Sequence, residues 1–281
     1  MANVSPADSS SQPFLARHEF LIRRLHSLSG LVPVGAYMVV HLLTNASVLE
    51  SPAAFQRNVY GIHSLGRLLP VVEWVFIFIP ILFHAIIGVA IIRGGLPNHG
   101  SYPYARNIRY SLQRASGIVA FFFIAWHVFH MHGWFHADWW LKTVATPLAG
   151  AQFKAFNATS TAGSAIQQHW LVSVFYAIGI LACVFHLANG IWTMGITWGV
   201  WVGPIAQRRA AAVCTAGGIA LAAVGLGALG GMATVDVEKA KQVEDRMFHH
   251  KLEAGEVPND SHKRTDGDHK DDGQPADMAR K

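Results

Sequence analysis

Residues 181–192 read LACVFHLANGIW, and this stretch lies inside a long part of the chain that carries no charge. Between Lys154 and Arg208 there is no Lys, Arg, Asp or Glu, so the run is apolar and long enough to cross a bilayer as a helix. His186 stands in the middle of it. Because an unpaired polar group in hydrocarbon costs several kcal/mol, His186 needs a defined partner.

The composition extends this conclusion to most of the chain. Of the 281 residues, 52% are hydrophobic and only 14% are charged, which excludes an ordinary soluble domain. A bilayer core of about 30 Å needs roughly 20 apolar residues for each helical crossing. Five segments meet that length: 27–47, 71–92, 115–135, 170–193 and 210–232. The sequence therefore predicts an all-α membrane protein, with a five-transmembrane-helix bundle over residues 27–232.

The distribution of charge predicts the orientation of the bundle. Lys and Arg are more frequent in the connections on the N-terminal side, so the positive-inside rule places residues 1–26 in the cytoplasm and, after five crossings, the C-terminus outside. Residues 233–281 are polar, mixed in charge and contain Pro and Gly, which predicts a tail that is disordered or loosely helical. Residues 139–168 are expected to form an outer loop or surface helix. The basic residues are scattered, so we expect no nucleic-acid partner.

Each of the first four predicted helices contains one histidine, namely His41, His84, His127 and His186. Counting about 1.5 Å per residue from the flanking polar residues puts His84 and His186 in the inner half of the membrane. The same count puts His41 and His127 nearer the outer side. Two histidines that face each other at one depth can supply both axial nitrogens of a six-coordinate haem iron. The spacing thus predicts two bis-histidine haems.

Two glycines agree with this interpretation. Gly88 and Gly190 follow His84 and His186 by four residues, so each lies one turn away on the same helix face, where a flat macrocycle could approach. Ordinary small-residue helix packing is the alternative. Any single membrane histidine could also merely be hydrogen-bonded to a neighbouring helix. Zinc or copper fits less well, because these metals favour one compact cluster, often with thiolates or carboxylates.

Four quoted motifs resemble the dihaem cytochrome b anchors of succinate:menaquinone oxidoreductases and fumarate reductases: RRLHSLSGLVPVGAYMVVHLLTN, EWVFIFIPILFHAIIGV, YSLQRASGIVAFFFIAWHVFH and CVFHLANGIWTMGITWGV. The likeness covers all five helices, from about residue 19 to residue 229. It implies a complex II in a bacterial inner membrane, with a flavoprotein and an iron–sulfur subunit on the cytoplasmic face. It also implies two haems b, one held by His84 and His186 and the other by His41 and His127, that pass electrons from succinate to menaquinone. This chain itself would carry no dicarboxylate catalytic site.

Three further residues are candidates for supporting roles. Glu73 is the only carboxylate in a predicted span and could donate protons to a quinone, although a favourable charge at a helix start also explains it. Ser27 and Arg114 could bind haem propionates, with the positive-inside rule as the alternative for the arginine. Three more histidines follow the third span, where interfacial placement is favoured over proton entry: His130, His132 and His136.

Two other functions remain open. The same anchor could serve a quinol:fumarate reductase, which runs the reaction in the opposite direction. Residues 182–185 contain no carboxylate, whereas some fumarate reductase anchors have a glutamate just before the fourth histidine, so succinate oxidation is favoured. A proton or solute transporter that uses membrane histidines is the more distant alternative, since intramembrane Asp or Glu and broken helices are absent.

Overall fold

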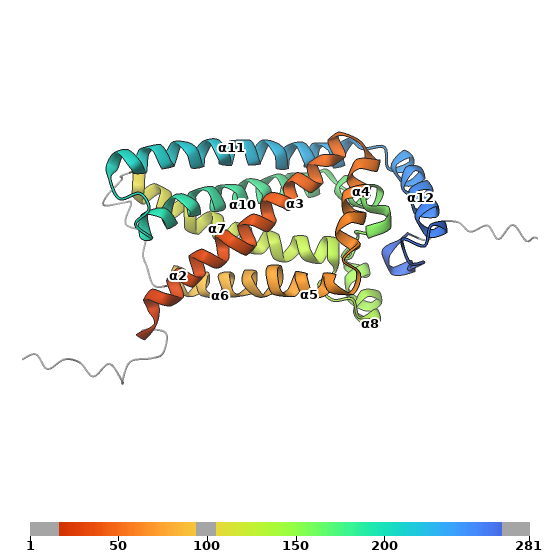
Figure 1. Ribbon diagram of the computed structural model, residues 1–281, viewed down its shortest axis with the longest axis horizontal. Coiled ribbons are helices and arrows are strands. Elements are labelled where there is room, and N and C mark those ends of the chain that lie inside the picture. Colours follow the sequence, from red (N-terminus) through yellow and green to blue (C-terminus); the bar gives the residue numbers. More distant parts are fainter. Residues whose placement is uncertain (1–16, 94–104, 266–281) are drawn as a thin grey trace, which may run out of the picture.

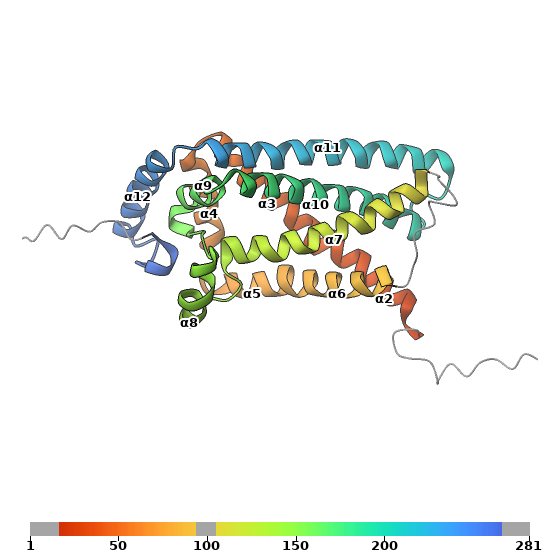
Figure 2. The same ribbon diagram turned by 180° about the vertical axis from the view of Figure 1, so that it is seen from behind.

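The computed structural model describes residues 17–93 and 105–265, which form helices and turns with no strand in either range. Five helical stretches are long and apolar enough to cross a membrane, and they lie side by side in one bundle (Figures 1 and 2). They extend over Glu19–Leu49, Gly66–Arg93, Asn107–His132, Trp170–Thr197 and Pro204–Thr234. The predicted all-α fold with five spans is confirmed. Each span is longer than its predicted apolar segment, because the helices continue beyond the apolar residues.

The first two spans each contain a π-helical segment. The first consists of α2 (Glu19–Ser29), the π-helical η2 (Gly30–Gly35), α3 (Ala36–Ala46) and η3 (Ser47–Leu49). The second consists of η4 (Gly66–Leu68), α5 (Leu69–Glu73), the π-helical η5 (Trp74–Phe78) and α6 (Ile79–Arg93). Pro33 lies inside η2, and Pro80 follows η5. A proline lacks the N–H for the bond to the carbonyl four residues earlier, which accounts for the irregular turn at each place.

The other spans are the helices α7 (Ala105–His132), α10 (Trp170–Thr197) and α11 (Pro204–Thr234). Helix α10 lies centrally and packs against α7 and α11, and α11 also packs against α3. Helix α6 packs on α2 and η2 but touches α7 only lightly, and no residue of α6 is buried. The second span is therefore held away from the centre of the bundle, and this separation leaves room for the cavity described below.

Three helices cover the end of the bundle where the first, third and fifth spans finish, which we call the cap end (Figure 1). They are α4 (Pro52–His63), α9 (Ala158–Gln167) and α12 (Val237–Glu253). Between α7 and α9 the chain forms α8 (Asp138–Trp140), η6 (Leu141–Ala145), η7 (Thr146–Leu148) and η8 (Ala155–Asn157), and the short η9 (Ser261–Lys263) follows α12. The opposite end, where α2 begins, is called the α2 end.

Of the two alternatives for the tail, disorder is wrong for α12, which is a packed helix, and the segment 139–168 contains a helix that is buried and not on the surface. Phe248 of α12 is fully buried against Phe156, and most residues of α9 are buried. The apolar residues of α12 recur at helical spacing, so the helix can bury one face although its composition is polar. Residues 266–281 of the predicted tail lie outside the described ranges.

Buried polar side chains attach α12 and α4 to the start of α9. The Glu244 carboxylate, which is 0% exposed, accepts hydrogen bonds from the backbone N–H of Thr159 (2.5 Å) and from Ser160 Oγ (2.5 Å). Gln56 Oε1 accepts from the N–H of Ala158 (2.8 Å), while its Nε2 donates to the Ala155 carbonyl (2.8 Å). These acceptors satisfy the free N–H groups at the helix N-terminus, where a negative charge is also favourable. The cap is thus an integral part of the fold.

Candidate functional site

A cavity of about 1090 Å³ lies between α2, η2, α6, α7 and α10. Its lining reaches from Arg24 and Trp198 at the α2 end to Glu73 and His136 near the cap end. The walls are mostly apolar, as in pockets that hold cofactors, and the volume is at the top of the usual range of about 300–1,000 Å³. Loose packing of α6 is the structural reason that the space exists.

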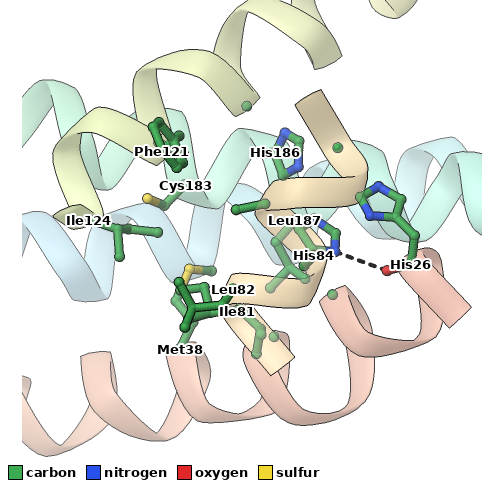
Figure 3. A pocket seen from close by; sticks show the side chains of 18 of the residues that line it. His26, Met38, Ile81, Leu82, His84, Phe121, Ile124, Cys183, His186 and Leu187 are labelled. Carbon is green, nitrogen blue, oxygen red and sulfur yellow. Dashed lines mark hydrogen bonds between the residues drawn. The ribbon is translucent and has the colours of Figure 1, made fainter. Parts of the chain in front are cut away.

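His84 and His186 both line this cavity, from α6 and α10 respectively (Figure 3). Their ring centroids are 6.1 Å apart, with an angle of 88° between the ring planes. Two metal–nitrogen bonds of about 2 Å each would place the centroids of two trans imidazoles roughly 6 Å apart. The spacing therefore suits one metal atom held between the two rings, and the cavity around them suits a macrocycle.

The second pair, His41 of α3 and His127 of α7, has ring centroids 5.9 Å apart and an angle of 74° between the planes. This spacing is similar to that of the first pair, but neither ring lines the cavity. Instead, Phe123 stacks on His127 at 5.7 Å. The rings thus contact each other in the same pairs that their estimated depths gave. The first pair lies beside a cavity, whereas the second pair is packed against a side chain.

The Nδ1 atoms of three of these histidines have hydrogen-bond partners. His84 Nδ1 lies 2.9 Å from the His26 carbonyl, and His186 Nδ1 lies 3.1 Å from the Gln113 carbonyl. His127 Nδ1 lies 3.2 Å from the hydroxyl of Tyr176. Such a partner on Nδ1 is typical of metal-bound histidine, because it fixes the tautomer and leaves Nε2 for the metal. The fourth ring, His41, has the Asn45 amide 3.4 Å from its Nε2.

A chain of polar side chains connects His186 to Arg109. Asn189, which is 3% exposed, donates from Nδ2 to Gln113 Oε1 (2.8 Å) and accepts from Arg109 Nε (2.9 Å). The Gln113 amide in turn donates to the His186 carbonyl (3.1 Å). Each buried polar group in this chain has a partner, so the network can hold the α10 segment that carries His186 in a defined position.

The closest glycine approaches to the histidine rings occur at positions that the H-x-x-x-G pattern does not identify. A Cβ at Gly30 would lie 2.3 Å from His84 Cε1, and one at Gly117 would lie 2.8 Å from His186 Cε1. Gly88 and Gly190 line the cavity, but a Cβ on Gly88 would first meet the His26 ring and one on Gly190 the Gln113 amide, both at 3.4 Å. The glycine that makes room for each ring is therefore on the facing helix.

Ser27 and Arg114, the candidates for binding propionates, both line the cavity. Ser27 Oγ accepts a hydrogen bond from Trp198 Nε1 (3.1 Å) and donates one to the Arg24 carbonyl (2.9 Å). Arg114 donates from Nη2 to the Ile91 carbonyl (3.2 Å). Both side chains lie at the α2 end, where they could reach the anionic edge of a cofactor held by His84 and His186.

Glu73 lines the cavity near the cap end, together with His132 and His136. The rings of these two histidines lie 4.2 Å apart. The favoured explanation of interfacial placement is wrong for His130, which is 3% exposed and binds the Tyr176 hydroxyl through Nδ1 (2.9 Å). Titratable groups therefore gather at this end of the cavity.

Within the two described ranges, no group of three or more His, Cys, Asp or Glu could hold a metal ion. The histidines occur as pairs, and a pair of axial ligands suits a metal whose other ligands come from a porphyrin.

No family model matches the chain. Comparison with curated proteins finds the succinate dehydrogenase cytochrome b558 subunit of Bacillus subtilis (strain 168), which is 34% identical over 211 residues. The match covers 75% of this chain and 96% of the relative. The chain belongs to the family of succinate dehydrogenase cytochrome b subunits. The cytochrome b subunit is accordingly a multi-pass membrane protein and part of an oxidoreductase complex. About a quarter of its residues have no counterpart in that relative.

Sequence reasoning missed several residues around the paired histidines: Gly30, Gln113, Gly117, Tyr176 and Asn189. A signal existed for Asn189, which stands three residues after His186 in the quoted apolar stretch and needs a partner as much as the histidine does. No comparable signal marks Gly30 or Gly117, because their importance depends on which helices face each other.

Proposed function

We propose that this chain anchors a succinate dehydrogenase and passes electrons from its iron–sulfur subunit through two bis-histidine haems b to menaquinone. The observation that carries this proposal is the pairing of four histidines from four spans into two sets, with centroid spacings of 6.1 and 5.9 Å. The resident group would supply reversible one-electron transfer, with a potential that depends on its ligands and its burial. The flavoprotein and the iron–sulfur subunit would dock at the α2 end, with that end in the cytoplasm.

The residues of the chain have distinct parts in this proposal. His84 and His186 would hold the haem nearer the α2 end, and His41 and His127 the haem nearer the cap end. Hydrogen bonds from the Nδ1–H groups to carbonyls make the ligands more basic and fix their rings. Because the second pair does not line the cavity, a porphyrin there requires neighbouring side chains such as Phe123 to move.

Quinone reduction would take place near the cap end of the cavity. Glu73, His132 and His136 are the titratable groups there, and reduction of a quinone to a quinol consumes two protons. A group that donates a proton must be able to exchange it with water, and a position close to the cap end allows this. We assign Glu73 as the proton donor, with succinate oxidation as the direction. The Glu73→Gln variant should reduce quinone more slowly while it retains both haems, and unchanged rates at every pH would refute the role.

Replacement of the four histidines tests the assignment of the haems. The variants His84→Ala and His186→Ala should each lose the same haem, and His41→Ala and His127→Ala should each lose the other. Haem content per complex is measured from the pyridine haemochrome, and electron paramagnetic resonance identifies the haem that remains. The exposed His250 of α12 provides the control, since His250→Ala should retain both. Full haem content in any of the four variants would refute ligation by that residue.

A further inference from the structure

A second, smaller cavity of about 220 Å³ opens on the side of the bundle between α7, α10 and α11. Its walls include the exposed apolar side chains of Leu181, Phe185 and Ile219. Gly218 forms part of the floor, where a Cβ would lie 3.0 Å from the Ala188 Cβ. Because these walls belong to membrane spans and face outward, the groove is open to the lipid phase. An acyl chain fits such a surface.

Arg109 of α7 lies in the wall of this groove. It is near the α2 end of its span, which begins at Asn107, so the guanidinium lies at the level of lipid headgroups. Helix α7 begins there beside the end of α10 and the start of α11 (Figure 2). The exposed Arg208 and Arg209 follow the start of α11 at the same end. The groove therefore carries one cation in its wall, Arg109, and two further arginines lie at the same end of the bundle.

The guanidinium of Arg109 is fixed in position. Its Nε donates to Asn189 Oδ1 (2.9 Å), and its central carbon lies 3.9 Å from the centroid of the Trp192 ring. In the described parts of the chain, neither terminal NH2 group of Arg109 has a protein acceptor. An oriented guanidinium with both terminal groups available is suited to two parallel hydrogen bonds to a phosphate.

We propose that this groove binds one anionic phospholipid, with its phosphate on Arg109 and an acyl chain along α10 and α11. Charge complementarity identifies the headgroup, since a basic pocket between membrane helices selects anionic lipids. The apolar walls distinguish a lipid from a free phosphate ion, which would leave them uncovered. The groove is separate from the cavity that His84 and His186 line, but Arg109 and Asn189 also belong to the network that supports His186, so haem content is measured beside lipid binding.

The experiment uses the intact complex in a mild detergent, with native mass spectrometry to count bound lipids. Added phosphatidylglycerol should bind in one tightly held copy, and phosphatidylcholine with the same acyl chains should bind at least about tenfold more weakly. The Arg109→Gln variant should lose that preference. Arg93→Gln is the matched control, because it removes an exposed charge at the same end of the bundle but outside the groove.

A second variant and a second measurement complete the test. Ala222→Phe leaves Arg109 in place but fills the groove, so it should also reduce binding of phosphatidylglycerol. In a thermal unfolding assay followed by tryptophan fluorescence, phosphatidylglycerol should stabilise the wild type and Arg93→Gln only. Equal binding of both lipids, an equal lipid count in all variants, or the same stabilisation by inorganic phosphate would overturn the proposal. Haem absorbance, recorded in parallel, reports separately on whether each variant retains its proposed haems.

Discussion

The Asn189→Leu variant should destabilise the bundle and disturb one of the two proposed haems without affecting the other. Asn189 is 3% exposed and makes two well-formed side-chain hydrogen bonds, at 2.9 Å with Arg109 and 2.8 Å with Gln113. The leucine side chain has a similar size but can neither accept nor donate a hydrogen bond. The substitution therefore removes both bonds and leaves a guanidinium N–H and an amide oxygen without partners at a half-buried position between the helices.

The magnitude follows from those two bonds. Hydrogen bonds between membrane helices contribute about 0.6 kcal/mol on average and up to about 1.7 kcal/mol, and a bond to a charged group contributes about 1.5–3 kcal/mol. The sum gives a loss of roughly 2–5 kcal/mol in the free energy of unfolding. Because the network also supports the Gln113 amide at the His186 carbonyl, the haem nearer the α2 end should change its midpoint potential and its electron paramagnetic resonance signal.

Asn45→Leu is the matched control, because the Asn45 amide donates to the carbonyl of His41 (2.8 Å) and lies beside the other pair. It should change the haem nearer the cap end only. The assays are reversible unfolding in detergent mixtures, redox titration and low-temperature electron paramagnetic resonance. If Asn189→Leu left stability and both potentials unchanged, or moved both haems equally, the network would have no role in positioning His186.

Three further predictions test the glycines and the cap. Gly117→Val should displace the His186 ring and cause the loss of one haem, because even a Cβ at residue 117 would lie 2.8 Å from His186 Cε1. Gly190→Ala is the control, since a Cβ at residue 190 has its nearest contact at 3.4 Å, and this variant should keep normal haem content. Haem absorbance measures both. Glu244→Leu should reduce the stability of the cap by roughly 2–4 kcal/mol, because it leaves the N–H groups at the start of α9 unpaired. Hydrogen exchange should then accelerate in α9 and α12 but not in α10, and unchanged exchange would contradict this prediction. Burial, together with the charge of Lys263, lowers the pKa of His63 to about 4. Between pH 4 and pH 6.5 the unfolded cap therefore binds a proton at His63 that the folded cap does not bind. The stability of the cap should rise by about 1–2 kcal/mol over this range. Limited proteolysis at pH 4.5 and pH 7 measures this, and His63→Phe should respond less to pH than the wild type.

The cap illustrates why part of the fold escaped sequence reasoning. Composition predicted a disordered or loosely helical segment after residue 233, but burial of α12 depends on residues distant in the chain. Glu244 binds backbone groups at Thr159 and Ser160, and Phe248 packs on Phe156. Burial of a carboxylate raises its pKa and is unfavourable unless donors surround it, and only the folded cap brings those donors together.

The sequence by itself determined the five spans and the pairing of the histidines by depth. Both follow from one-dimensional quantities: the apolar length that matches the bilayer thickness, and a rise of about 1.5 Å per residue along each helix. Only the tertiary structure decided which residues surround the paired rings. Rotation of a helix about its axis and the identity of its neighbours are set by packing between spans, so Gly30, Gly117 and Tyr176 became recognisable only once the facing helices were in place.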